Sequence, residues 1–248
     1  MSPVEFALLV CAGIGGGLVG SVAGLASLVT YPALLAAGLS PISANVTNTV
    51  ALLFSSVGSV LGSRVELHDQ WRKLRYLVVA GVLGGAAGGV LLLATPSGAF
   101  TRLVPWLIGL ASLAILLPRR PVQERSAHRD GLALGGLVFL VGVYGGYFGA
   151  AAGVMMLALI LRWTGDTLAR SNAAKNVILG GANGIAALGF AVFGSVHWLE
   201  MVPLAIGCLI GGRLGPVVVR RSPPAALRLV IAGAGLGLAV YLGVDAYA

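Results

Sequence analysis

Charged residues are scarce in this chain of 248 residues. Asp, Glu, Lys and Arg together make up 10% of the sequence, whereas 58% of the residues are hydrophobic. A soluble globular domain carries about 25% charged residues, so the composition excludes an ordinary water-soluble protein. The apolar excess also excludes an intrinsically disordered chain. The remaining interpretation is a polytopic membrane protein, in which each helical crossing takes about 20 residues.

Residues and motifs for covalent chemistry are also few. The two cysteines, Cys11 and Cys208, lie inside apolar segments and are expected to be buried, reduced thiols outside any disulfide. No P-loop lysine pattern, metalloprotease helix or nucleophile–base pair occurs, and His68, His128 and His197 fall in or near expected loops. We therefore predict that the protein is not an enzyme and that it holds no metal and no cofactor.

Apolar residues gather in long runs that lack the strict alternation of barrel strands, so helices are favoured. The runs 6–38 and 131–161 are too long for one straight crossing and too short for two comfortable ones. Glycines interrupt both runs near the middle, which predicts in each a helix–break–helix hairpin that is either re-entrant or made of two short tilted spans. The expected fold class is an all-α polytopic membrane protein of about eight to ten helical segments. The apolar runs are 6–38, 42–63, 74–95, 99–118, 131–161, 172–194, 199–219 and 225–244.

The net charge of +8, from 16 Lys and Arg against 8 Asp and Glu, is concentrated in short loops. Because Lys and Arg are retained on the cytoplasmic side, we interpret this charge as a topology signal and predict no nucleic-acid partner. Counting crossings places both termini outside a bacterial inner membrane, with the lipid bilayer as a partner and a homodimer left open. The basic loops are 64–75, 118–130 and 213–228, and the loops expected outside are 39–44, 95–101 and 194–200.

The sequence matches itself at an offset of about 125 to 127 residues. The basic loop 64–75 then corresponds to 191–202, which has no Lys or Arg, so equivalent loops lie on opposite sides. This pattern predicts an inverted-topology repeat, as in many secondary transporters. The expected halves are 1–122 and 123–248, each with a broken hairpin and three spans. The matches include Gly17 with Gly142, Gly20 with Gly145, Gly24 with Gly149, Asn45 with Asn172, Asn48 with Lys175 and Trp71 with Trp198.

The interrupted helices indicate where a ligand would bind. A break inside the bilayer leaves backbone groups without partners, which is tolerated only where protein or a watery cavity satisfies them. Half-helices that start near each break would aim their N–H groups at it, and two such ends facing each other would bind an anion. Polar residues of the following spans could line the same cavity. The candidate binding residues are Gly24, Leu25, Ala26, Asn45, Asn48, Thr49, Ala150, Gly153, Asn172, Lys175, Asn176, Asn183 and Arg213.

The sign of the substrate's charge follows from the charged side chains expected at membrane depth. A cation carrier or proton pump would ordinarily place a carboxylate there, but the acidic residues all lie near span ends or in loops. Lys175 and Arg213 instead fall inside apolar runs. The alternative for Lys175 is that its side chain snorkels to the cytoplasmic surface. Amides and hydroxyls around a cation suit an oxyanion with several acceptor oxygens. The pattern therefore favours an anionic substrate.

The sequence resembles the TauE/SafE sulfite exporter family, also called the toluene sulfonate uptake permease family, over nearly its whole length. The resemblance is strongest in GSVAGLASLVTYPALLAAGLSPISANVTNTVAL, residues 20–52, and in a degenerate second copy, GGYFGAAAGVMMLALILRWTGDTLARSNAAKN, residues 145–176. It implies a carrier of sulfur-containing anions, with both export and uptake among family members. It also implicates the polar positions Asn45, Asn48, Thr49, Asn172, Lys175 and Asn176. Since Lys175 corresponds to Asn48, a two-fold symmetric binding mode is in doubt.

Three functional hypotheses follow from the sequence. The leading one is a secondary transporter of a small sulfur-containing anion, such as sulfite, thiosulfate or an organosulfonate, which works by alternating access. The second is an anion channel on the same scaffold. The third is a membrane subunit that transports nothing.

Overall fold

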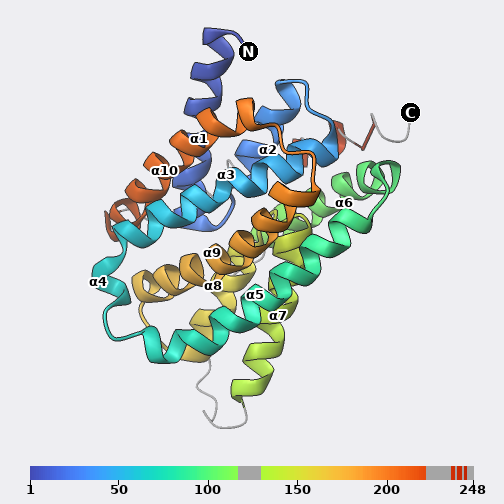
Figure 1. Ribbon diagram of the computed structural model, residues 1–248. Helices are drawn as coiled ribbons and strands as arrows, with labels where there is room; N and C mark the ends of the chain where they lie inside the picture. The colour runs from blue at the N-terminus through green and yellow to red at the C-terminus, as the bar shows by residue number, and fades with distance from the viewer. Residues whose placement is uncertain (117–129, 222–235, 238, 242, 245–248) are drawn as a thin grey trace.

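The computed structural model describes residues 1–116, 130–221, 236–237, 239–241 and 243–244. Within these residues the regular elements are helices and no strand occurs, which confirms the all-α fold class. The expected boundary between the halves, at 122 and 123, and most of the apolar run 225–244 lie outside the described residues. The helices are α1 Pro3–Ala23, α2 Ser27–Ala36, α3 Pro41–Gly62, α4 Arg64–Leu67, α5 Trp71–Ala94, α6 Ser97–Leu116, α7 Asp130–Tyr147, α8 Ala152–Thr164, α9 Leu168–Phe193 and α10 Trp198–Arg221 (Figure 1).

The described part of the chain contains five helices that are long and apolar enough to cross a bilayer. This finding supports a multi-pass membrane protein. The shorter helices α2, α7 and α8 are also apolar. The five long segments are Pro3–Ala23, Pro41–Gly62, Leu74–Ala94, Leu168–Phe193 and Trp198–Val219.

The two central helices, α3 and α9, begin in the same way. Ser40 precedes α3 in extended conformation, and its hydroxyl accepts a hydrogen bond from the backbone N–H of Ser43. Thr167 precedes α9, and its hydroxyl accepts from the backbone N–H of Arg170. Such caps satisfy N–H groups that have no partner in the first turn. Thus the cap residues fix where both central helices start.

The two long apolar runs each contain two helices. In the first, α1 ends at Ala23 and Gly24 takes a left-handed conformation, with φ of 78°, before α2 begins. In the second, the interruption falls between Tyr147 and Ala152, where Gly149 has φ of 75°. Glycine reaches this region of backbone conformation without the strain that a Cβ imposes, so the chain turns at these positions.

Glycines let the outer helices pack closely. α1 lies along α10, and a Cβ on Gly13 or Gly17 would collide with the α10 backbone. α5 lies along α7, and a Cβ on Gly84 or Gly88 would collide with the α7 backbone. Such close approach of backbones is what small residues allow between membrane helices. Figure 1 shows α1 and α7 starting at opposite ends of the molecule.

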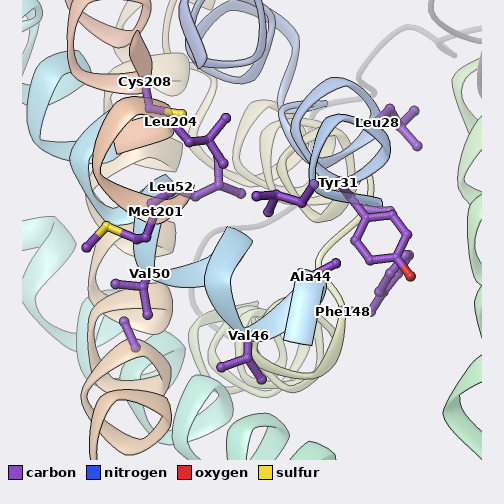
Figure 2. Packing of buried hydrophobic residues seen from close by; sticks show 14 of the residues in the cluster. Leu28, Tyr31, Ala44, Val46, Val50, Leu52, Phe148, Met201, Leu204 and Cys208 are labelled. Atoms are coloured by element: carbon purple, nitrogen blue, oxygen red, sulfur yellow. The ribbon is translucent and has the colours of Figure 1, made fainter. Parts of the chain in front are cut away.

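The apolar core joins elements from both parts of the chain. Figure 2 shows Tyr31 of α2 beside Phe148, and their ring centroids are 5.5 Å apart in an edge-to-face arrangement. Cys208 of α10 is buried in the same core, as expected. Cys11 is exposed, so its expected burial is wrong. Only the side of α1 that faces its neighbours is covered, and Cys11 lies on the other side.

Candidate anion site

A small cavity of about 60 Å³ lies where the two helix interruptions meet. It has room for a few water molecules or one small ion. More than half of the candidate binding residues line this cavity. These are Gly24, Ala26, Thr49, Gly153, Lys175, Asn176 and Asn183.

Gly24 and Gly153 bring the two interruptions into direct contact. A Cβ placed on either glycine would overlap the backbone of the other. This contact joins the segment before α2 to the first turn of α8. The absence of side chains at both positions therefore allows the two helix starts to share one cavity.

Both half-helices point their N-termini at the cavity. Ala26 and Ser27, at the start of α2, line it together with Ala152 and Gly153 at the start of α8. Neither α2 nor α8 has a side-chain hydrogen bond that caps its N-terminus. The first N–H groups of a helix and the positive end of its dipole favour an anion. The backbone thus supplies positive potential from two directions.

Among the described residues, Lys175 of α9 is the one cationic side chain that lines this cavity, and only 1% of it is exposed. Its Nζ donates hydrogen bonds to the carbonyl oxygens of Gly20 and Ser21, at 3.0 Å and 3.1 Å. These carbonyls belong to the last turn of α1, where the dipole favours a cation. Lys175 therefore does not snorkel to the surface but remains beside the cavity.

Asn45 and Asn172 make equivalent contacts in the two parts of the molecule. The Nδ2 of Asn45 donates to the carbonyl oxygen of Tyr147, at 2.8 Å, and that of Asn172 donates to Ser21, at 2.9 Å. Each amide thereby satisfies a carbonyl at the end of the other part's first helix. Neither side chain lines the cavity, so these two asparagines hold the walls together.

Asn48 and Thr49 differ in their access to the cavity. The Asn48 amide is buried, accepts from the Thr30 hydroxyl and donates to the Ser27 hydroxyl, and does not line the cavity. Thr49 lines it, and its hydroxyl donates to the Asn45 carbonyl oxygen at 3.0 Å. Asn48 therefore ties α3 to α2, while Thr49 has a hydroxyl oxygen at the cavity wall.

Asn176 and Asn183 complete the polar wall from α9. Asn176 is 6% exposed, and its Nδ2 is a buried donor without a hydrogen-bond partner in the protein. Asn183 is half-buried and also lines the cavity. An unpaired buried donor is costly for a protein. The unpaired Nδ2 beside Lys175 is therefore suited to an acceptor from outside the protein.

The structure does not place the remaining candidates at the cavity. Leu25 and Ala150 are buried next to the two interruptions without lining it. The Ala150 carbonyl oxygen accepts a hydrogen bond from the Tyr144 hydroxyl, at 2.6 Å, which steadies the second interruption. Arg213 is exposed on α10 and lies outside the cavity.

Serines of α3 contribute to the cavity although sequence reasoning did not select them. Ser55, Ser56 and Ser59 line it, as does Ser27 of α2. The signal was present in the sequence, because Ser55 and Ser59 continue the helical spacing of three and four residues from Asn48. In the part of the chain that the structure describes, no Asp or Glu lines the cavity, and no cluster of three metal-ligating side chains occurs.

A sequence profile of the family described as "Sulfite exporter TauE/SafE" matches residues 9–242. The chain belongs to the TauE/SafE sulfite exporter family. The TauE/SafE chain is similar to "Probable membrane transporter protein YfcA" of Escherichia coli strain K12, with 28% identity over 228 residues, 88% of this chain and 82% of that protein.

Two further relatives cover nearly the whole TauE/SafE chain. A "Probable membrane transporter protein" of Haemophilus influenzae is 26% identical over 231 residues, 91% of this chain and 89% of its own length. "Probable membrane transporter protein ORF9" of Sinorhizobium sp is 24% identical over 244 residues, 96% of this chain and 92% of its own length. No solved structure matches the chain significantly. The family and these names establish a membrane transporter family.

Proposed function

We propose that this chain is a secondary transporter that carries a small sulfur-containing anion, such as sulfite, thiosulfate or an organosulfonate, across a bacterial inner membrane. The observation that carries the proposal is Lys175, a buried cation beside a cavity onto which two half-helix N-termini also open. An ionisable residue at this depth ordinarily serves function. The substrate would bind as an oxyanion among N–H, amide and hydroxyl donors.

The donors at the cavity support an anion over a cation. The Asn176 Nδ2 has no partner, Lys175 contributes positive charge, and the hydroxyls of Ser27 and Ser55 lie in the wall. None of the described carboxylates lines the cavity. Charge-assisted hydrogen bonds to an anion are about twice as strong as neutral ones. The cavity would hold a compact anion head, with Lys175 as its main counter-charge.

The reciprocal packing supports an inverted repeat that works by alternating access. α1 lies along α10 as α7 lies along α5, and the Asn45 and Asn172 contacts correspond in the same way. α1 and α7 also start at opposite ends of the molecule (Figure 1). Transporters with inverted repeats bind substrate at the interface of the halves and rock around it. In this proposal both termini lie outside, and the anion is exposed to each side in turn.

The membrane potential alone would drive transport of an anion in one direction, without coupling to a second ion. Moving one charge across 100 mV changes its energy by about 2.3 kcal/mol. An interior that is negative therefore favours export of an anion. Sulfur chemistry rests on the family to which the chain belongs.

The proposal is tested by flux in proteoliposomes that contain the purified protein. Uptake of labelled sulfite is measured against external concentration, with thiosulfate, sulfate, sulfoacetate and taurine as competitors. A transporter gives flux that saturates and that rises when unlabelled substrate is present on the opposite side. Flux that neither saturates nor responds to substrate on the opposite side would identify a channel. Absence of flux and of binding for every anion would contradict both.

A further inference from the structure

A second cavity, of about 430 Å³, lies between α3, α5 and α9. Its volume falls in the range of small-molecule sites. Its lining is mainly apolar and includes Val57, Val60 and Leu61 of α3 and Trp71 and Leu74 of α5. Such a lining gives a hydrated inorganic anion almost no hydrogen-bond donors. An apolar group is the occupant that this cavity suits.

The rim of this cavity faces the surroundings of the helix bundle. Val57, Leu61 and Trp71 line the cavity and yet are exposed. α3 is one of the helices long enough to cross a bilayer, and Trp71 is the first residue of α5. Tryptophan is enriched where a helix leaves the bilayer for water. The medium at this rim is therefore lipid, with the interface near Trp71.

Arginines lie close in sequence to the residues that form the rim of this second cavity. Arg75 follows Trp71 by one helical turn and therefore shares its face of α5. Arg75 is exposed, as are Arg72 and Arg64, the first residue of α4. The acidic groups of this segment are Glu66 and Asp69, and the Asp69 carboxylate pairs with His68 at 2.8 Å. Basic pockets between helices bind the head groups of anionic lipids. The apolar cavity and the arginines together match the two parts of such a lipid.

The geometry points to this cavity as a binding site for one anionic phospholipid. An acyl chain occupies the space between α3 and α9, and the phosphate lies against Arg75. Ser56 and Asn176 line both this cavity and the polar one. The bound acyl chain therefore packs on the other side of a wall of the anion cavity. The inference does not depend on which anion is transported or on whether any is.

Native mass spectrometry of the full chain tests this site by comparing retained phosphatidylglycerol and phosphatidylcholine at equal concentrations. The wild type should retain phosphatidylglycerol preferentially. Arg75→Gln should reduce that preference about fivefold, whereas Arg102→Gln removes the same charge from α6 and should not. Val57→Trp fills the cavity and should displace both lipids. Val79→Trp is the matched control, because Val79 is exposed on α5 and lines neither cavity.

Three results would overturn the lipid site. The first is equal retention of the two lipids by the wild type, and the second is equal loss in Val57→Trp and Val79→Trp. The third is a water-filled cavity, detected with a charged thiol reagent on a chain whose Cys11 is replaced by serine. Labelling of Val57→Cys as fast as Val65→Cys, a position that is 81% exposed, would show water in place of an acyl chain. Slow labelling of Val57→Cys supports the lipid.

Discussion

Gly24 and Gly153 lie in backbone contact, although they come from the two separate helix interruptions. Either residue with a side chain would push the start of α2 away from the start of α8. Because both starts line the anion cavity, this contact determines the distance between the two N-termini. Stability and anion binding should therefore both depend on these two glycines.

Comparing alanine substitutions at Gly24 and Gly38 separates the cost of the contact with Gly153 from the cost of backbone strain. Gly24→Ala should lower stability by about 1–2 kcal/mol through its positive φ and by about 1–3 kcal/mol more through overlap with Gly153. Gly38→Ala is the control, since Gly38 has φ of 88° but nothing near its Cβ position. Thermal unfolding in detergent measures the difference. Equal destabilisation by the two substitutions would show that the contact between the interruptions contributes nothing.

Removal of either reciprocal amide should loosen the connection between the two parts. Asn45→Ala leaves the Tyr147 carbonyl oxygen without its amide donor, at a cost of about 1–3 kcal/mol. Asn172→Ala should cost less, about 1 kcal/mol, because the Ser21 carbonyl oxygen keeps its hydrogen bond from Lys175. Thr95→Val removes an exposed hydroxyl that donates within its own helix, and should cost less than about 0.5 kcal/mol. Unfolding by heat or denaturant in detergent compares the three variants. Asparagine variants as stable as Thr95→Val would show that these bonds do not hold the walls.

Asn176 should show opposite effects on stability and on binding. Asn176→Leu removes a buried donor that has no protein partner, so the protein without substrate should be at least as stable as the wild type. Anion affinity should fall because that donor is lost. Thermal unfolding with and without sulfite measures both effects.

Asn48→Leu is the matched control for Asn176→Leu. The Asn48 amide bonds to both Thr30 and Ser27, so its loss should destabilise the protein with or without an anion. If Asn176→Leu destabilises the protein as much as Asn48→Leu does, Asn176 has a structural role and not a binding role.

The helices could be predicted from the sequence because backbone polar groups inside a bilayer must form hydrogen bonds within the protein. Apolar runs of bilayer length must be helical, and the runs 42–63 and 172–194 became α3 and α9 with ends shifted by a few residues. Each interruption contains a glycine with positive φ, Gly24 in the first and Gly149 in the second, but Ala151 in the second also has a positive φ, of 61°. The short helix α4 was not expected, because four residues carry no periodic signal.

Residues that line the cavity were harder to distinguish in the sequence from residues that hold its walls together. The spacing of Asn45 and Asn48 places them on one face of α3, and Lys175 was expected to face the same cavity from α9. Of these three residues, only Lys175 lines the cavity. The difference arises from tertiary contacts, since Asn45 reaches the Tyr147 carbonyl and Asn48 reaches α2. The spacing of residues along a helix shows which face of the helix a residue occupies. It does not show which group on a neighbouring helix that residue contacts. Arg213 was selected for its charge, and the structure leaves it exposed on α10.

The most direct test measures sulfite binding to purified Lys175→Met by calorimetry, with Arg213→Met as the matched control. A lost charge-assisted hydrogen bond costs about 1.5–3 kcal/mol, so Lys175→Met should bind sulfite at least about tenfold more weakly than the wild type. Arg213→Met should bind it as the wild type does, because Arg213 lies outside the cavity. Unchanged affinity in a folded Lys175→Met protein, or an equal loss in both variants, would contradict an anion site built around Lys175.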